Sequence, residues 1–555
     1  MRFSNLLPLL IVAAGLARAQ SPDPPSRVAR LNYLNGPVSF RPGGEDDWAA
    51  AALNYPLTAG DHLWTDPGAQ TEMHVGSTAI RMGPETALEF LNLDDRTVQL
   101  SLTDGSLNVH IRSMQPDEVY EVDTPNASIL LHPGDYRIGV NGEANSSVVI
   151  VNAGEADVAG SGTDFPVYPR QMAHLAGTDS LTQEITAVPA PDGFDAWCAQ
   201  RERREMSMVS ARYVPRDIIG YEDLDAYGVW RNVPPYGWVW SPASVPVGWA
   251  PYREGHWAWV EPWGWTWIDD EPWGFAPFHY GRWTFAAGAW VWVPGRLDVA
   301  VRPVYAPALV AFVGGPRFSL SVGVGGGGLA AWFPLGPGEV YRPAYAVSPT
   351  YVTRINIVHV TDVTVINRVD VVNVRYVNQT VPGAVVAVPH EAFVGARPVA
   401  AVAVHVEARE VIGAPVAMTA AVPPRRESVL AGPVRTVAPP ARHMEGRVVT
   451  RTPPPPPPVS FAAKQRALES NGGRPLDPAQ MNTVRAAAPP RPAPRVIPVR
   501  PPQPAPRVEE TRPPQPAPRV EEARPPQPAP RAEEERKVEP QRNDKKPPNK
   551  KATRK

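Results

Sequence analysis

The most restrictive feature of this sequence is an aromatic run between Gly228 and Pro294, which holds 13 of the chain's 17 tryptophans. The run contains its own repeat, since Gly248–Tyr252 (GWAPY) returns 26 residues later as Gly274–Phe278 (GFAPF). Within each copy, aromatic and polar residues alternate between Gly and Pro breaks, a pattern that is typical of short strands joined by tight turns. We therefore predict one β-hairpin for each repeat, and about three hairpins that stack to bury their rings.

The rings outnumber what so small a domain can enclose. Few Leu or Ile accompany them, so the tryptophans must supply most of the burial, at about 150–250 Å² each. Strict alternation places rings on both faces of each hairpin. One interpretation is that all the rings are core. The other is that surplus rings form a platform that stacks on the C–H faces of a glycan. The candidate ligand-binding residues are Trp257, Trp259, Trp263, Trp265, Trp267, Trp273 and Tyr280.

The N-terminus has the pattern of a secretory signal peptide at 1–19. Arg2 supplies the positive charge, Leu6 to Leu16 the apolar core, and Ala17–Ala19 an A-x-A cleavage site before Gln20. No later stretch approaches 18 uninterrupted apolar residues, so we expect no transmembrane anchor and a periplasmic or secreted protein. Cys198 is the only cysteine, which excludes an internal disulfide.

Residues 28–177 carry short alternating runs separated by Asp, Gly and Asn turns, which predicts a domain of short β-strands. Three segments, Gly60–Ala69 (GDHLWTDPGA), Ala79–Gly83 (AIRMG) and Ala87–Leu91 (ALEFL), resemble the FecR domain of bacterial envelope proteins. Regulatory members of that family carry an anti-sigma segment and a membrane helix ahead of the domain. Here the predicted signal peptide leads almost directly into it, so the resemblance implies the fold more than transcriptional signalling.

A linking helix is predicted at 192–212. Phe194, Trp197 and Cys198 share one face by their spacing, and the charged run Arg201–Glu205 (RERRE) is interpreted as a solvated face. The aromatic repeat domain follows at 221–300, with continuations such as WFPLGPGEVY further on. Together the two domains resemble exported bacterial proteins in which a FecR-like domain precedes a Trp/Tyr/Gly-rich domain of unknown function.

The remaining sequence is predicted as two regions. Residues 301–422 are predicted to form a Gly-rich and Val/Asn/Thr-rich β region, in which 351–381 favours one or two long edge strands or a small solenoid-like sheet. Residues 423–555 are predicted to be a disordered, Pro-rich, basic tail, with a six-proline run at 453–458 and three copies of RPPQPAPR(V/A)EEx from Arg500. The predicted fold class is therefore mainly β, with two β domains and a long disordered tail.

The near-neutral net charge of −2 conceals a strong polarity. Residues 20–200 hold 25 Asp and Glu against 8 Arg, a net of −17, whereas 421–555 hold 27 Lys and Arg against 13 Asp and Glu, a net of +14. The basic tail therefore suits an anionic envelope surface. We predict no nucleic-acid partner.

The only grouping with catalytic character is Asp269, Asp270 and Glu271, with His279 eight residues on. Paired acids beside tryptophan are typical of glycosidases, and acids also bind hard cations. However, this trio followed by Pro272 also fits a turn, and adjacent strand residues point to opposite faces. We predict no catalytic residues, no metal site and no cofactor.

The leading hypothesis is a non-enzymatic, exported envelope protein that binds or scaffolds a glycan or an envelope protein. The alternative is a periplasmic FecR-like sensor that relays a signal to a partner. A polysaccharide-acting enzyme is the third hypothesis.

Overall fold

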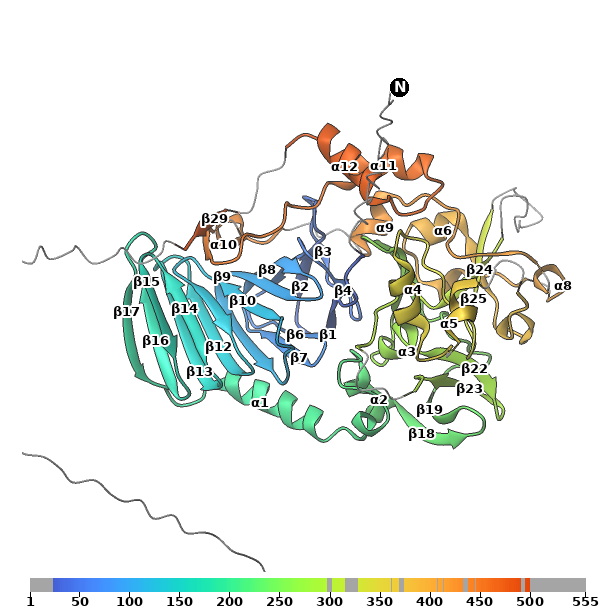
Figure 1. Ribbon diagram of the computed structural model, residues 1–555, viewed down its shortest axis with the longest axis horizontal. Coiled ribbons are helices and arrows are strands. Elements are labelled where there is room, and N and C mark those ends of the chain that lie inside the picture. Colours follow the sequence, from blue (N-terminus) through green and yellow to red (C-terminus); the bar gives the residue numbers. More distant parts are fainter. Residues whose placement is uncertain are drawn as a thin grey trace, which may run out of the picture. The chain divides into compact units, whose positions relative to one another are not determined.

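The computed structural model describes residues 23–296, 302–314, 328–360, 362–368, 374–406, 408–412, 414–432, 438–444, 446–490 and 495–499. The predicted signal peptide, nearly all of the glycine-rich loop at 323–328 and the RPPQPAPR repeats lie outside these residues. The described chain is mainly β, as the sequence predicted (Figure 1).

The N-terminal β domain consists of two sheets that share one long strand, β9. One sheet has the order β4-β1-β6-β7-β9-β12-β13-β16-β17, and the other has the order β3-β2-β5-β8-β9-β10-β11-β14-β15. Neighbours are antiparallel except for the parallel pair β9–β10. The strands are β1 (Ala29–Asn35), β2 (Val38–Arg41), β3 (Ala49–Ala50), β4 (Pro56–Leu57), β5 (His62–Thr65), β6 (Gln70–Val75), β7 (Thr78–Met82), β8 (Ala87–Leu93), β9 (Thr97–Ile111), β10 (Val119–Asp123), β11 (Ser128–Leu131), β12 (Gly134–Asn141), β13 (Ser146–Ala153), β14 (Ala156–Gly160), β15 (Thr163–Val167), β16 (Gln171–Ala176) and β17 (Thr182–Ala187).

The predicted linking helix is α1 (Gly193–Met206), followed by a short 3-10 turn, η1 (Val209–Arg212). Asp192 begins the helix because its carboxylate accepts from the main-chain N–H groups of Phe194 and Asp195. Phe194 and Cys198 are buried, as their shared face predicted. Burial raises the pKa of the Cys198 thiol to about 12, so this cysteine is an inert core residue.

Each aromatic repeat forms one hairpin, as predicted, and tryptophan stands opposite tryptophan in all three. The pairs are Trp230 with Trp240, Trp257 with Trp267, and Trp283 with Trp292. The first and third hairpins share a four-stranded sheet of order β18-β19-β23-β22, and the second hairpin, β20–β21, is a sheet of its own. The strands are β18 (Gly228–Val233), β19 (Gly237–Pro242), β20 (Gly255–Val260), β21 (Gly264–Asp269), β22 (Arg282–Ala286) and β23 (Ala289–Val293).

A further four-stranded sheet, of order β26-β25-β24-β27, joins segments that lie far apart in the sequence. Its strands are β24 (Val310–Val313), β25 (Leu329–Pro334), β26 (Val386–Pro389) and β27 (Val416–Ala417). Between β25 and β26 the chain is helical, in α4 (Pro349–Asn356) and α5 (Val363–Arg368), so the strands predicted at 351–381 are wrong. Ser348 caps α4 by accepting from the N–H of Tyr351, and Pro349 occupies the first turn, where its missing N–H costs nothing.

The predicted disordered tail does not begin at residue 423, because the described segments between 423 and 499 contain helices and two paired short strands. The predicted tail from residue 500 lies outside the described residues. The other short elements are α2 (Tyr221–Tyr227), α3 (Ala276–His279), η2 (Asn378–Thr380), α6 (His390–Val394), α7 (Val399–Val402), α8 (Ala408–Val411), α9 (Arg426–Leu430), α10 (Ala441–Met444), β28 (Val448–Thr450), α11 (Phe461–Ser470), α12 (Pro478–Ala487) and β29 (Val496–Pro498).

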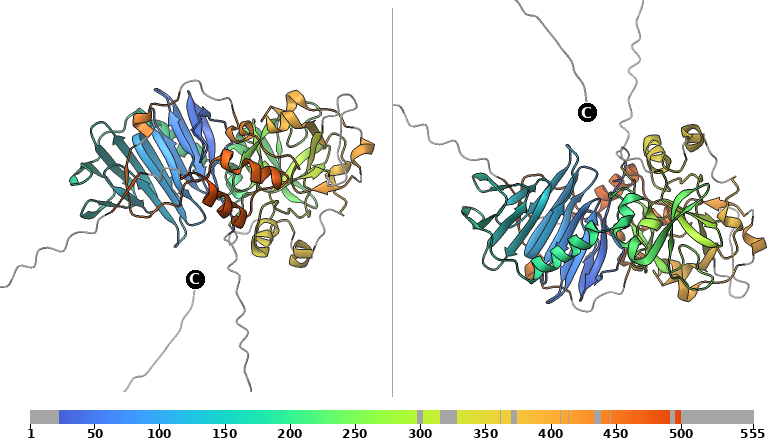
Figure 2. Two further views of the ribbon diagram at one scale, coloured as in Figure 1. Left: turned by 90° about the horizontal axis from the view of Figure 1, so that it is seen from above. Right: turned by 90° about the horizontal axis from the view of Figure 1, so that it is seen from below.

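We call residues 446–490 the C-terminal strap, because they contact both the β domain and the aromatic hairpins (Figure 2). On the β domain, the N–H of Val449 donates to the carbonyl of Thr124 at 2.8 Å, and the N–H of Phe461 donates to Glu45 at 2.7 Å. On the aromatic side, the ammonium of Lys464 lies 2.8 Å from the carboxylate of Glu261. The strap thus connects the N-terminal β domain to the aromatic hairpins.

Candidate functional site

The seven predicted binding residues are all buried, with exposed fractions between 0% and 6%. The prediction of an exposed platform at Trp257, Trp259, Trp263, Trp265, Trp267, Trp273 and Tyr280 is therefore wrong. The reason is that segments more than a hundred residues away cover the outer face of the second hairpin. Phe393 of α6 lies with its ring centroid 5.4 Å from Trp257 and 4.4 Å from Trp265, and the carbonyl of Val422 accepts from the Trp265 indole at 3.0 Å.

The buried rings pack on one another at angles that suit their quadrupoles. Trp257 meets Trp267 edge-on at 5.5 Å and Trp332 edge-on at 5.2 Å, and Trp263 meets Tyr305 edge-on at 5.1 Å. Edge-to-face pairs at such distances contribute about 0.5–1.5 kcal/mol each beyond the burial of area. The surplus of rings therefore serves a core larger than residues 221–300.

Three rings lie together at the surface, and we call them the aromatic ledge: Trp238, which is exposed, and Tyr213 and Trp230, which are half-buried. The Tyr213 ring lies 4.6 Å from Trp230 and 4.8 Å from Trp238, between the two indoles. Trp238 is 49% exposed. Trp230 is fixed by a 2.8 Å hydrogen bond from its indole N–H to the Ser210 hydroxyl. The ledge is thus a preorganised row of aromatic faces.

The sequence carried a signal for this ledge that the pattern analysis missed. In β20–β21, Trp259 stands opposite Trp265 beside the turn. In β18–β19 the corresponding pair is Asn232 opposite Trp238, and Asn232 is exposed. A repeat that replaces one ring of a pair with a polar residue marks the place where the other ring is not enclosed.

Asp269 of the acidic trio and His279 lie in different hydrogen-bonding environments. Asp269 ends β21 and is buried, and its carboxylate accepts from the Trp267 indole at 2.9 Å and from the N–H of Glu271 at 3.1 Å. Burial raises the pKa of Asp269 well above its usual value. His279 lies in α3, where its Nδ1 contacts the Ala306 carbonyl at 2.8 Å. Asp269 and His279 are thus held by different partners.

A cluster of buried charges joins the β domain to the segment that precedes the hairpins. Arg30 of β1 is fully buried, and its guanidinium lies 2.9 Å from Glu222 and 2.8 Å from Asp223, both in α2. It also donates to the Pro272 carbonyl at 2.6 Å. Two carboxylates and a carbonyl satisfy a charge that would be costly to bury unpaired.

His74 of β6 lies at the centre of the same cluster. Its Nδ1 is 3.2 Å from Glu222, and its Nε2 is 3.4 Å from Glu72 and 3.8 Å from Glu205. Burial alone would lower the pKa of His74, but the charges of Glu222 and Glu205 outweigh burial and raise the pKa to about 10. His74 is therefore a buried imidazolium that connects α1, α2 and the β domain.

The charged run on α1 belongs to this cluster, so its interpretation as a solvated face is wrong. Glu205 is buried and accepts at 2.6 Å from Arg112, which lies in the connection between β9 and β10. Arg201 lies 2.7 Å from Glu72 of β6. The helix lies across strands whose outer side chains are charged, so its polar face is the one that packs. The charge pattern alone does not show whether the charged face of α1 is exposed to water or packs on an oppositely charged sheet.

Among the described residues, no group of three or more His, Cys, Asp or Glu is placed to hold a metal ion. No helix in the described ranges is long and apolar enough to cross a membrane.

Comparison with known families gives one match. Residues 221–339 match a family of unknown function, DUF6600. The matched region contains all three aromatic hairpins and the strands β24 and β25. This agrees with the resemblance of the Trp-rich stretch and its continuation to a domain of unknown function. Comparison with curated proteins finds no match.

Two crystal structures of a protein described as a "putative anti-sigma factor" from Parabacteroides distasonis ATCC 8503 are similar to part of this chain. The first, at 1.65 Å, has 12% identity and a TM-score of 0.22, and the similarity covers 25% of this chain and 64% of that chain. The second, at 2.50 Å, has 11% identity and a TM-score of 0.21, over 26% and 63%. This chain thus spans less than two thirds of those proteins, and no function is transferred from them.

Proposed function

We propose that this protein is a non-enzymatic binding module of the bacterial cell envelope that holds a glycan strand on the aromatic ledge. The observation that supports this proposal is the exposed indole of Trp238, which packs beside the half-buried rings of Tyr213 and Trp230, in a chain whose other hairpin tryptophans are buried. Aromatic faces that stay open to water at the end of a packed core are typical of ligand and partner sites.

The chemistry of the ledge suits a sugar. The exposed side of Trp238 offers flat apolar area to the C–H face of a pyranose ring, and Tyr213 supports that indole from within. The exposed amide of Asn232, opposite Trp238, can exchange hydrogen bonds with ring hydroxyls. Because the core fixes Trp230 through Ser210, little conformational entropy is lost when a ligand stacks on the ledge.

Two sequence features support an envelope location. The pattern at 1–19 is that of a signal peptide for export, and three segments resemble the FecR domain of envelope proteins. The net charge of +14 over residues 421–555 suits an anionic envelope surface as a second, less specific partner. A non-enzymatic role is supported by Asp269, whose buried carboxylate is occupied by the Trp267 indole.

The experiment compares Trp238→Ala with Tyr168→Ala in retention of the full-length protein on purified peptidoglycan. Tyr168 is also 49% exposed but lies in the β domain, so it controls for the loss of an exposed ring. A stacked ring contributes about 1–3 kcal/mol in nucleic-acid complexes, and on that scale Trp238→Ala weakens retention roughly tenfold or more. Equal retention of both variants and the unchanged protein would exclude the ledge as the glycan site.

A second candidate function is a sensor that relays ledge occupancy to the β domain. The buried cluster around His74 and Arg30 supports it, because α2 leads directly into β18 and is ionically bound to β1 and β6. Hydrogen exchange with and without peptidoglycan fragments separates the two functions. A relay changes protection in β6 and α1, whereas a scaffold changes protection only near the ledge.

A further inference from the structure

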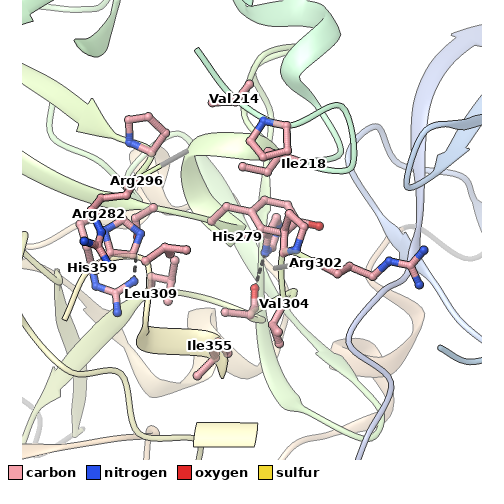
Figure 3. Close-up of a pocket in the computed structure, with 18 of the residues that line it drawn as sticks. Val214, Ile218, His279, Arg282, Arg296, Arg302, Val304, Leu309, Ile355 and His359 are labelled. Atoms are coloured by element: carbon pink, nitrogen blue, oxygen red, sulfur yellow. Dashed lines mark hydrogen bonds between the residues drawn. The ribbon is translucent and has the colours of Figure 1, made fainter. Parts of the chain in front are cut away.

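A small cavity lies between the third hairpin and α4, and Tyr213 of the ledge forms part of its wall. Its wall includes His279, Arg282, Arg296, Arg354 and His359, together with apolar residues such as Leu309 (Figure 3). About 50 Å³ of space inside it is open to the centre of a water molecule. That space accommodates roughly four water-sized groups. With Arg302, the wall holds four arginines and two histidines around a volume suited to a small ligand.

His279 presents an unused acceptor in this wall. Its ring is fully buried between Phe275, with centroids 4.4 Å apart, and Tyr305, at 4.9 Å. The carbonyl of Ala306, 2.8 Å from Nδ1, can only accept, so Nδ1 carries the proton. Nε2 is then a lone-pair acceptor, and it has no hydrogen-bond partner among the described residues. Burial lowers the pKa of His279 to about 3, so the ring stays neutral.

Arg282 brings a buried positive charge whose hydrogen bonds all go to neutral oxygens, while the Glu339 carboxylate lies near enough to stabilise the charge without a direct bond. Its guanidinium donates to the carbonyls of Glu339 and Gly281 and to the Asn356 side-chain oxygen, at 3.1, 2.8 and 3.0 Å. The Glu339 carboxylate accepts from the main-chain N–H groups of Gly336 and Val377 instead. A guanidinium has five N–H donors, so two remain beyond the three that these bonds use. Burying such a charge is costly unless an anion lies near it.

Three further arginines line the cavity towards its outer side. Arg296 is exposed, and Arg354 is half-buried and donates to the Ser26 hydroxyl at 3.4 Å. Arg302 lies 2.8 Å from the Glu118 carboxylate and is already paired. Opposite Arg282, the buried Nε2 of His359 also has no partner within the described part of the chain. The cavity therefore offers guanidinium donors for negatively charged oxygens, together with imidazole acceptors for a hydroxyl proton.

We propose that this cavity binds the phosphate group of inorganic phosphate or of a phosphate monoester. Near neutral pH a phosphate group carries charged oxygens, which accept from Arg282, Arg296 and Arg354. In its protonated form it also carries a P–OH group, which can donate to Nε2 of His279. Sulfate has the same shape and charge but no hydroxyl proton at neutral pH, so it leaves His279 unsatisfied. A buried acceptor left without its donor is the basis of strong discrimination.

The test measures binding to the full-length protein by calorimetry at pH 6.5, where inorganic phosphate and glycerol 1-phosphate both retain a protonated fraction. We expect inorganic phosphate to bind at least tenfold more tightly than sulfate. Tighter binding of glycerol 1-phosphate would identify a monoester as the natural form, and tighter binding of inorganic phosphate would identify the free ion. Equal affinity for phosphate and sulfate, or binding of neither, would overturn the proposal.

Rim variants test the location of the site without disturbing the core. Arg296→Gln combined with Arg354→Gln is expected to weaken phosphate binding about tenfold or more, because each charge-assisted hydrogen bond is among the stronger kinds. Arg203→Gln, at an exposed position of α1, is the matched control and leaves binding unchanged. His279→Phe is expected to reduce phosphate affinity to the level of sulfate. Should that variant not fold, the phosphate-to-sulfate ratio and the rim variants still decide the question.

Discussion

The C-terminal strap gives the sharpest prediction about stability, through Phe461→Ala. Phe461 begins α11 and is buried, and one helical face also buries Lys464 and Leu468. Replacing a buried Phe by Ala typically costs about 3–5 kcal/mol. The observable loss is limited by the free energy that docks the strap, because a strap that detaches can lose no more. We therefore expect the variant to lose up to about 3–5 kcal/mol locally, with release of the strap from both halves.

The assay combines urea unfolding with limited trypsin digestion. Arg466 and Arg474 of the strap have exposed side chains, but trypsin cleaves after them only when this part of the strap unfolds locally. Each 1.4 kcal/mol of lost docking energy raises the open population tenfold, so cleavage accelerates by roughly two or more orders of magnitude. Phe285→Ala is the matched control, because that ring is 48% exposed and its loss is expected to cost less than about 1 kcal/mol.

The result that refutes this reasoning is equal digestion of Phe461→Ala and the unchanged protein, with both cut at once after Arg466. That outcome would return residues 446–490 to the disordered tail that their proline content indicated.

Three further predictions concern the core and its contacts. His74 has a folded pKa of about 10 against an ordinary value near 6.5, so its stabilisation is full below about pH 6.5 and lost as pH rises through 10; urea midpoints across that window should fall. Gly60→Ala should destabilise more than Gly68→Ala in thermal unfolding, because both have φ near +80° to +90° but only a Cβ at Gly60 meets Pro458, at 2.5 Å. Cys198 should react with iodoacetamide at pH 8 only after unfolding, and rapid labelling of the native protein would contradict its burial.

The hairpins were predictable from sequence because their pattern is local. Alternation between Gly and Pro breaks sets both the strands and the turns, and the register that pairs Trp257 with Trp267 follows from the position of the turn. The burial of those rings was not predictable in the same way. Phe393 and Val422 cover them from more than a hundred residues away, and no local period shows such a contact.

The strands predicted at 351–381 and the disorder predicted from residue 423 have a common physical cause. In both segments, hydrogen-bonding signals that begin helices outweigh the preference of the average composition. The β-branched residues after Tyr351 favoured strands, yet Ser348 and Pro349 form a helix start that packing against Val340 and Val360 completes. The prolines after residue 452 favoured disorder, yet Asp477 and Gln480 form a capping box that begins α12. Caps are short, specific hydrogen-bonding patterns, and average composition does not represent them.

The segment that matches DUF6600 depends on residues outside its bounds. Within its core, Trp257 contacts Phe393, and β24 and β25 are flanked by β27 and β26 from beyond residue 339. On the other side, the Asn54 amide of the β domain donates to the carbonyls of Asp269 and Glu271 at 2.9 and 2.7 Å. The hydrophobic core continues past both ends of the matched segment. The β domain and the C-terminal helices therefore help to cover the aromatic rings. Trp238 of the ledge is the hairpin tryptophan that this continuous core covers least, which is why the ledge is the part of the aromatic cluster best placed to meet a ligand.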